Sequence, residues 1–264
     1  MPALTGTLRL LLNDAVRKIG EGLRALGVAE GGILLVHSSL KSLGFVEGGP
    51  ETVIEGLRDA LGPGGTLLMP ALSYLTVTEQ APLFDINTTP SCVGAVPEYF
   101  RRRPGTLRSA HPTHSVCATG PLAADLLGRH ADNDTPCGEG SPFRLLRDRG
   151  GQILFLGCGL TPNTSMHAVE ELDEPPYLFR PNRVVYEMAL SEKERIRRAY
   201  RVHDFEGFTQ RYDRIEGILD SASLRTGRVR DAFCHLLEAR PMWLAAREAL
   251  RRDPFFFVDA IPAT

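Results

Sequence analysis

The fold of this chain is expected to be organised around residues 150–177, which read GGQILFLGCGLTPNTSMHAVEELDEPPY. Residues 153–156 are apolar and lie between glycines, which predicts a buried strand of a parallel sheet. The glycines after this strand allow a tight turn, and Thr161 or Asn163 can cap a helix that follows. Sites of α/β proteins usually lie at the carboxyl ends of strands, so this stretch is the first candidate site.

The helix expected after the turn carries a histidine and two carboxylates. His167 is followed by Glu170 and Glu171, and spacings of three and four residues place both carboxylates on its face. Two hydroxyl residues, Thr164 and Ser165, come just before it. A histidine beside a carboxylate at a strand-to-helix corner suits an acyl-transfer or hydrolytic site. The alternative is a capped helix whose histidine lies on the surface.

Composition favours a small-molecule ligand. The 264 residues carry a formal net charge of −2 with 23% charged residues, so no nucleic-acid or membrane partner is expected. One large core is predicted, as a single domain over 1–264, in a monomer or a homodimer. The amino end has only three consecutive leucines, with charges on both sides, so we expect neither a signal peptide nor a membrane span, and a cytoplasmic protein. Five cysteines without a CxxC pair argue against disulfides.

Two strand-loop-helix units precede the central stretch. Apolar strands are predicted over 33–36 and 66–72, and a helix over 50–61 begins at Pro50. Successive units of this kind predict a parallel sheet with helices on both faces.

The two ends of the chain are expected to be largely helical. A hydrophobic pattern predicts a helix over 8–26, and 184–189 resembles a strand. Charged helical stretches are predicted over 191–201, 205–217 and 229–252, the last with a break at Pro241.

The loop after the first strand, HSSLKSLGFVEGG, is rich in small and hydroxyl residues. Ser38, Ser39 and Ser42, with backbone N–H groups and Lys41, are suited to phosphate. The loop matches neither a Walker motif nor GxGxxG, so a serine-rich turn that binds no phosphate remains the alternative.

A second cluster of candidate residues lies in RSAHPTHS, where Arg108 precedes His111, His114 and Ser115. The histidine spacing is that of metal ligands, but the cysteines and histidine that follow complete no zinc pattern, and no metal is expected. The alternative is a pocket in which the histidines donate hydrogen bonds and Arg108 pairs with a phosphate or carboxylate.

Three motifs, in this order, resemble the aminoglycoside 3-N-acetyltransferase family. They are HSSLKSLGFVEGGPETVIEGLRDALGPGGTLLMP, TPSCVGAVPEYFRRRPGTLRSAHPTHSVCATGP and GEGSPFRLLRDRGGQILFLGCGLTPNTSMHAVEE, and the match ends near residue 177. The resemblance implies a three-layer α/β/α sandwich with a mostly parallel central sheet and a helical C-terminal part, distinct from the GNAT fold. It also implies an enzyme that uses acetyl-CoA to acetylate an amine.

The resemblance assigns roles to individual residues. Residues expected to bind the coenzyme fall in three of the family's motifs: His37, Ser38, Ser39, Leu40, Ser42 and Gly44 around its phosphates; Ser91, Val93 and Gly94 along the pantetheine arm; and Arg108, His111, His114 and Ser115 near the thioester and the phosphates. The catalytic motif NTSxHxxE falls on Asn163, Thr164, Ser165, His167 and Glu170.

Amine acetylation explains the chemistry of the catalytic motif. An alkylamine is mostly ammonium at neutral pH, so a base must accept its proton, and His167 is the natural base, with Glu170 stabilising the imidazolium. The hydroxyls of Thr164 or Ser165, or the N–H groups at the helix start, are suited to stabilise the oxyanion, at about 3 kcal/mol per donor. No cysteine lies in a recognisable nucleophile motif, so direct transfer in a ternary complex is preferred to a covalent acyl-enzyme. Coenzyme A thiolate leaves readily, and no metal is needed.

An acidic cluster follows the proposed base. Glu171, Asp173 and Glu174 are expected to bind a cationic amine substrate such as an aminoglycoside, although a solvated acidic turn is the alternative. Other hypotheses are the same chemistry on a non-aminoglycoside amine of natural-product biosynthesis, a non-catalytic coenzyme A-binding protein, and a metal hydrolase built on His111, His114 and His167.

Overall fold

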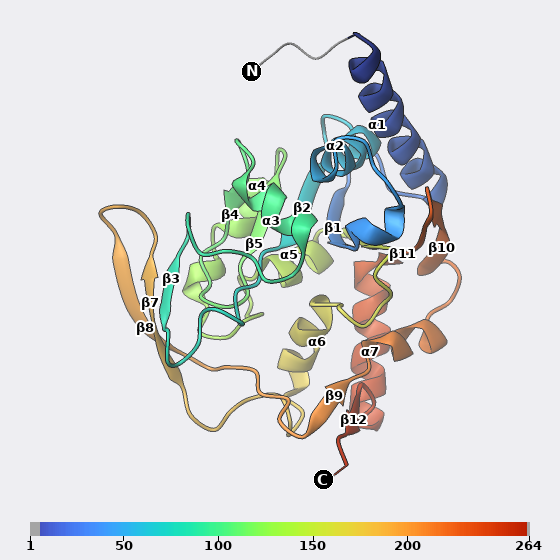
Figure 1. The fold of residues 1–264 in the computed structure, drawn as a ribbon. Helices are drawn as coiled ribbons and strands as arrows, with labels where there is room; N and C mark the ends of the chain where they lie inside the picture. The colour runs from blue at the N-terminus through green and yellow to red at the C-terminus, as the bar shows by residue number, and fades with distance from the viewer. Residues whose placement is uncertain (1–5, 263–264) are drawn as a thin grey trace.

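The computed structural model describes residues 6–262, in which a mixed seven-stranded sheet forms the centre of an α/β fold (Figure 1). Part of the amino end that was considered for a leader, residues 1–5, lies outside the described residues. The strands follow the order β10-β11-β6-β1-β2-β5-β4. Their bounds are β1 Ile33–Ser38, β2 Thr66–Pro70, β4 Leu107–Arg108, β5 Val116–Thr119, β6 Gln152–Leu156, β10 Leu224–Val229 and β11 Ala232–Glu238.

The prediction of a mostly parallel sheet is wrong. β1 pairs in parallel with β2 and β6, but every other pairing in this sheet is antiparallel. The physical reason lies at the two edges. A tight turn at Arg230, whose φ is +52°, returns β11 along β10, and this hairpin pairs antiparallel with β6. The short strands β4 and β5 extend the other edge in the same way.

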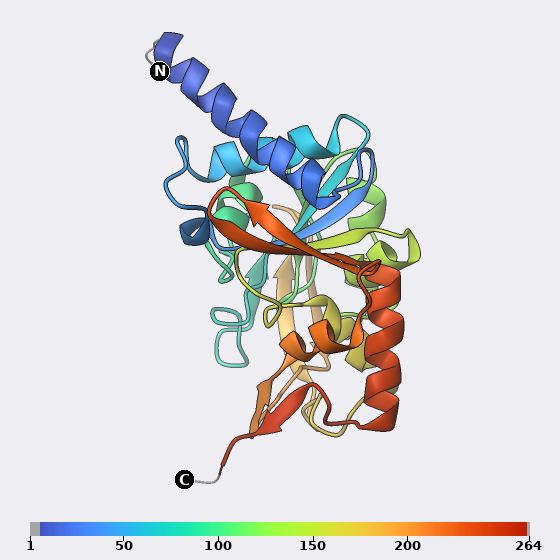
Figure 2. The same cartoon turned by 90° about the vertical axis from the view of Figure 1, so that its right-hand side faces the viewer.

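Helices cover both faces of the sheet because the strand side chains alternate between two apolar cores. Leu34 and Val36 pack in a core with α1 Gly6–Leu26, α2 Pro50–Leu61 and α3 Ala95–Arg102. Ile33 and Leu35 pack in the other, with α4 Ala123–Leu127, α5 Pro142–Asp148, α6 Ser165–Asp173 and α7 Ala239–Arg252. Figures 1 and 2 show α1 and α2 on one side of the sheet and α6 and α7 on the other.

Within residues 6–262, two smaller sheets and three 3₁₀ helices complete the fold. β3 Leu83–Asp85, β7 Val184–Ala189 and β8 Arg195–Tyr200 form a sheet with its own apolar cluster, and β9 Phe208–Gln210 pairs with β12 Val258–Ala260. The 3₁₀ helices are η1 Leu40–Leu43, η2 His130–Asp132 and η3 Tyr212–Ile218.

The prediction of a helical C-terminal part is also wrong for most of that region. Segment 191–201 contains β8, segment 205–217 contains β9 and most of η3, and 229–252 becomes helical only at α7. The arginine-rich segment 195–200 forms strand β8 because its backbone pairs with β7. A local charge pattern does not reveal this pairing. Pro241 does not break a helix, because it lies in the first turn of α7, where its missing N–H is not needed.

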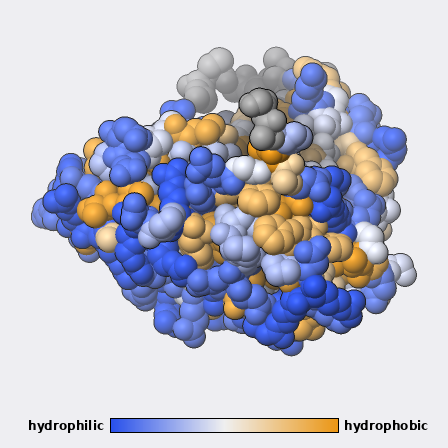
Figure 3. Space-filling model, turned by 90° about the horizontal axis from the view of Figure 1, so that it is seen from below, coloured by the Kyte–Doolittle hydropathy of each residue, from blue (hydrophilic) through white to orange (hydrophobic). Residues whose placement is uncertain are grey.

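The other predicted elements are confirmed, with small shifts at their ends. The helices over 8–26 and 50–61 and the strands over 33–36, 66–72, 153–156 and 184–189 are present. Helix α6 starts later than expected, with Thr164 at its N-cap. No helix in 6–262 is long and apolar enough to cross a membrane, and the face seen from below mixes hydrophilic residues with separate apolar groups (Figure 3).

Candidate active site

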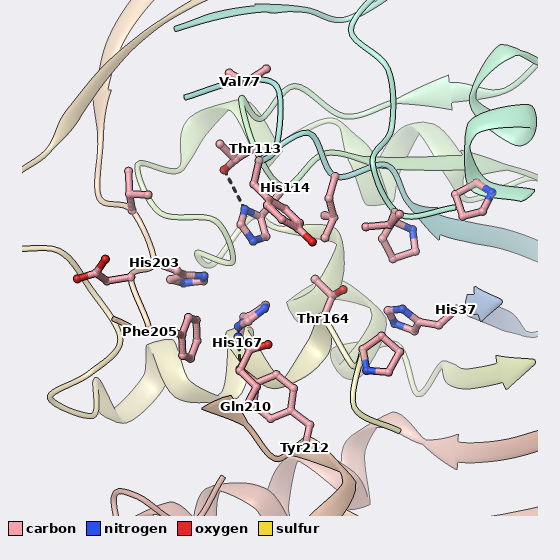
Figure 4. Close-up of a pocket in the computed structure, with 18 of the residues that line it drawn as sticks. His37, Val77, Thr113, His114, Thr164, His167, His203, Phe205, Gln210 and Tyr212 are labelled. Carbon is pink, nitrogen blue, oxygen red and sulfur yellow. Dashed lines mark hydrogen bonds between the residues drawn. The ribbon is translucent and has the colours of Figure 1, made fainter. Parts of the chain in front are cut away.

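A cavity of about 590 Å³ opens where β1 and β6 end. These strands are parallel neighbours, with His37 opposite Phe155 and Ser38 opposite Leu156, so the loops that follow them meet at one edge of the sheet. His37, Ser38, Thr164 and His167 line the cavity together with residues of loop 72–80 and of segment 202–212, which includes β9 and the start of η3 (Figure 4).

A hydrogen-bonded chain connects His167 to Glu170 through Tyr212. The Tyr212 Oη lies 2.9 Å from His167 Nδ1 and 2.7 Å from Glu170 Oε2, whereas the direct distance between His167 Nδ1 and Glu170 Oε2 is 3.5 Å. Burial, and then the Glu170 carboxylate, raise the pKa of Tyr212 well above 10, so its hydroxyl keeps its proton at neutral pH.

The hydrogen bonds of Tyr212 indicate which tautomer of His167 is present when its imidazole is neutral. The single hydroxyl proton of Tyr212 is donated to the Glu170 carboxylate, and the hydroxyl oxygen therefore accepts from His167 Nδ1–H. The Nε2 atom of His167 then carries a free lone pair. This is the state that a general base requires.

Glu170 is completely buried and receives a second tyrosine hydroxyl. Tyr177 Oη donates to Oε1 at 2.8 Å, while Tyr212 donates to Oε2. Burial, followed by the same carboxylate, also raises the pKa of Tyr177. Two hydroxyl donors therefore hold the carboxylate in one orientation and compensate for its loss of water.

Three further histidines surround His167 and are neutral at physiological pH. His114 and His203 lie with ring centroids 5.7 Å and 4.9 Å from that of His167 (Figure 4). Burial and then neighbouring histidines lower the pKa values of both well below 6.5. His37 stacks on Phe155, and burial lowers the pKa of His37 to about 3. The imidazoles therefore do not fill the cavity with positive charge.

Only the first two residues of the HSSLKSLG motif line the cavity in the described part of the chain. His37 and Ser38 do so. The remaining positions build the turn that follows: Ser42 Oγ donates to Ser39 Oγ at 2.9 Å, Leu40 packs against the core, and Gly44 has a φ of +72°.

The loop 91–94 approaches the same edge of the sheet. Val93 lines the cavity, whereas the Ser91 hydroxyl accepts from Val93 N. Gly94 has a φ of +116°, and a Cβ built on it would lie 4.0 Å from Ser38 O. The space would admit a Cβ, so it is the positive φ that favours glycine at this position.

Arg108, His111 and Ser115 shape the loop that carries His114, and none of the three lines the cavity. The Arg108 guanidinium donates to Ser115 Oγ and to the carbonyl oxygens of residues 71, 86 and 89. Ser115 Oγ donates to the carbonyl oxygen of residue 71, and His111 Nδ1 accepts backbone N–H groups of residues 113 and 114. Burial lowers the pKa of Arg108 to about 10.

The acidic cluster after the proposed base faces other parts of the chain. Glu171 accepts from Thr135 Oγ1, from the backbone N–H of residue 137 and from His203 Nε2, and burial raises the pKa of Glu171 to about 7. Asp173 pairs with arginines of α7 at 2.7 and 3.3 Å, and Glu174 with an arginine at 2.6 Å. None of the three lines the cavity within residues 6–262.

Two other carboxylates line the cavity, Glu79 and Asp204. Asp204 pairs with Arg180 at 3.1 Å, and Glu79 is an exposed residue of the loop between β2 and β3. Thr164 lines the cavity, whereas Ser165 is fully buried and does not line it.

Comparison with known proteins places this geometry in a family. The model of the aminoglycoside 3-N-acetyltransferase family matches residues 35–251. The chain belongs to this family. It is 36% identical over 236 residues to aminoglycoside N(3)-acetyltransferase IV of a Salmonella species, covering 88% of this chain and 86% of the relative.

Solved acetyltransferases have the same fold. A mutant of aminoglycoside acetyltransferase AAC(3)-IVa in complex with gentamicin has a TM-score of 0.78 and 34% identity, covering 91% of this chain and 89% of its own. AAC-IIIb in its binary complex with CoASH has a TM-score of 0.78 and 28% identity, covering 93% and 97%.

Three residues of the site in this acetyltransferase family member were not found by sequence reasoning: Tyr177, His203 and Tyr212. Tyr212 is 45 residues from His167 and His203 is 32 residues from Glu171. Tyr212 lies in segment 205–217, which was predicted to be helical, His203 lies between two predicted helices, and Tyr177 ends the stretch 150–177 without belonging to a motif. The sequence holds no signal that pairs them with α6.

Proposed function

We propose that this protein is an acetyl-CoA-dependent N-acetyltransferase that transfers an acetyl group directly to an amine of an aminoglycoside, the 3-amino group, in a ternary complex. The observation that carries the proposal is the chain from Glu170 through Tyr212 to His167, which leaves the His167 Nε2 lone pair free in the cavity wall. Membership in the family, and the gentamicin and CoASH complexes of the structural relatives, support it.

His167 acts as the general base in the proposed reaction. Its Nε2 accepts a proton from the substrate ammonium, and the freed amine attacks the thioester carbonyl of acetyl-CoA. The imidazolium still donates from Nδ1 to Tyr212, and the Glu170 carboxylate compensates its charge. The tetrahedral intermediate collapses as the thioester bond breaks, with coenzyme A thiolate as the leaving group. The attacking nitrogen gives its surplus proton to the departing sulfur, so the products are the amide and coenzyme A thiol. His167 then returns the first proton to solvent.

Thr164 stabilises the oxyanion in this mechanism. Its side chain lines the cavity at the N-terminus of α6, where the helix dipole also favours negative charge. A positioned donor at this point contributes about 3 kcal/mol to the transition state. Cys158 also lines the cavity, but burial raises the pKa of its thiol to about 12, which supports direct transfer rather than an acyl-cysteine intermediate.

The coenzyme contacts fall on His37, Ser38 and Val93, which line the cavity near β1. The other motif residues act indirectly in this proposal. Ser39, Leu40, Ser42, Gly44, Ser91 and Gly94 set the path of two loops, and Arg108, His111 and Ser115 hold the loop of His114.

Glu79 and Asp204 replace the acidic cluster as the proposed binding groups for substrate ammonium. Because the cavity wall holds only these two carboxylates within 6–262, and Asp204 is paired with Arg180, a less highly charged amine of natural-product biosynthesis is the second candidate substrate.

The test measures release of coenzyme A thiol from acetyl-CoA, with gentamicin, apramycin, kanamycin and simple amines offered in parallel. We expect release that requires an aminoglycoside, and a kcat at least about 10²-fold lower in His167→Ala while calorimetry still shows coenzyme A binding. Near-full turnover by His167→Ala would contradict the base assignment. Release with simple amines alone would replace the aminoglycoside by the second candidate.

A further inference from the structure

We propose that His114, His167 and His203 form a binding site for one divalent transition-metal ion of the zinc class, and that the bound ion blocks acetyl transfer. The blocking rests on the proposed role of His167, whereas the metal site itself does not. The three residues come from a loop after β4, from α6 and from the loop before β9, so only the tertiary structure brings them together (Figure 4).

The three imidazoles converge on one point. One ring nitrogen of each lies within 4.8 Å of the corresponding nitrogens of the other two. A tetrahedral zinc ion with bonds of about 2.0–2.1 Å requires its nitrogens about 3.3 Å apart. Binding therefore requires the side chains of His114, which lies in a turn, and His203, which lies at an isolated β-bridge, to move until the nitrogens reach that spacing.

One nitrogen of each ring is hydrogen-bonded to a partner of the kind that orients metal ligands. His203 Nε2 lies 2.8 Å from Glu171 Oε1, His167 Nδ1 lies 2.9 Å from Tyr212 Oη, and His114 Nδ1 lies 2.8 Å from Thr113 Oγ1. Histidine ligands of zinc usually donate their second N–H to a carboxylate, hydroxyl or carbonyl oxygen in this way. The second nitrogen of every ring is therefore the one left for an ion.

His203 gives independent support for a ligand at this point. Its side chain is 5% exposed, and its Nδ1 is among the buried atoms of the described residues that have no hydrogen-bond partner. A buried nitrogen with a free lone pair costs free energy unless a ligand satisfies it.

An ion in this site prevents the proposed reaction for a simple reason. The His167 Nε2 lone pair that accepts the substrate proton would be donated to the metal instead. The general base is then absent, and the ion adds positive charge where a cationic amine must bind. Metal-free protein is the active form in this scheme.

The binding test uses full-length protein freed of metal with a chelator and titrated with Zn²⁺ by calorimetry, and with Co²⁺ to record its visible spectrum. The variant is His203→Gln, whose amide can still donate to Glu171 but offers no imidazole nitrogen. The matched control is His235→Gln, a substitution in β11 away from the cavity. We expect one equivalent of Zn²⁺ bound by wild type and by the control, and at least about tenfold weaker binding by His203→Gln.

Inhibition is followed through the acetylated product by mass spectrometry, because Zn²⁺ also binds free thiols. Each protein is compared with its own metal-free rate. We expect Zn²⁺ to lower the rate at least about tenfold in wild type and in the control, at concentrations that leave His203→Gln within about twofold.

The outcomes separate the two proposals. Absence of saturable one-to-one binding, or equal affinity in wild type and His203→Gln, overturns the metal site. Stoichiometric binding through these histidines that leaves acetyl transfer unchanged overturns the blocking and contradicts His167 as the base. Loss of both binding and inhibition in His203→Gln supports the whole inference.

Discussion

Removing one oxygen atom tests how the proposed base is positioned. In Tyr212→Phe the hydroxyl between His167 Nδ1 and Glu170 Oε2 disappears, while the aromatic ring keeps its place in the core. His167 then has no hydroxyl to fix its tautomer. Its Nδ1 remains 3.5 Å from Glu170 Oε2, too far for a good hydrogen bond without movement.

The size of the effect follows from the bond that is lost. A hydrogen bond involving a charged group contributes about 1.5–3 kcal/mol. If the bond acts mainly on the imidazolium formed during transfer, kcat falls by about 10- to 100-fold, since 1.36 kcal/mol corresponds to one factor of ten. The KM for acetyl-CoA stays within about twofold, because the change lies at the base rather than at the coenzyme.

Tyr177→Phe is the matched control. It removes the other hydroxyl that donates to Glu170, at 2.8 Å, without touching His167. Both variants should lose about 1.5–3 kcal/mol of unfolding free energy in urea, because each deprives the buried carboxylate of one donor. Only Tyr212→Phe should lower kcat strongly and change the pH dependence of kcat/KM.

Steady-state kinetics from pH 6 to 9, together with urea unfolding of both variants, provide the measurement. Equal kcat values and superimposable pH profiles for Tyr212→Phe and wild type would refute the reasoning. An equal loss of kcat in the two variants would show that the Tyr212 hydroxyl acts by orienting the Glu170 carboxylate and not by setting the tautomer of His167.

Three further predictions concern residues whose surroundings differ from expectation. Arg108→Lys should lower the unfolding free energy by about 2–3 kcal/mol, because lysine cannot replace the forked contacts to Ser115 and three carbonyls, and KM for acetyl-CoA should stay nearly constant; a raised KM at unchanged stability argues for phosphate binding instead. Glu79→Gln should raise KM for a cationic aminoglycoside about threefold to tenfold at low salt, with kcat preserved, and an effect that survives high salt would count against it. The pKa of Glu171 is raised to about 7, against 4.5 in the unfolded chain, so between these two pH values the folded state binds more protons than the unfolded state. The folded state therefore loses stability as the pH rises from 4.5 to 7. In urea titrations, wild type should lose on the order of 1–3 kcal/mol of unfolding free energy relative to Glu171→Gln between pH 5 and pH 8. The opposite slope would contradict the burial of this carboxylate as the cause.

Local patterns predicted the elements whose side chains face a core. The apolar strand ending at His37, the strand before Gly157 and helix α2, which begins at Pro50, all follow from short apolar runs and their capping residues. The charged segments of the C-terminal part were misassigned, because a strand such as β8 is decided by pairing with β7 and not by its own periodicity.

The sequence by itself determined the family, through ordered motifs. It also determined that the proposed base His167 lies beside Glu170, because residues three apart on one helix are neighbours whatever the rest of the chain does. Tertiary structure decided through which atoms His167 and Glu170 are connected. Tyr212 enters between His167 and Glu170 only because η3 packs against the helices on that face of the sheet, and His203 reaches them only from a loop. It also buried Glu171, which accepts a backbone hydrogen bond, and placed Asp173 where it pairs with the arginines of α7. Contacts between distant segments depend on how the elements pack, and short-range sequence patterns carry no record of that packing.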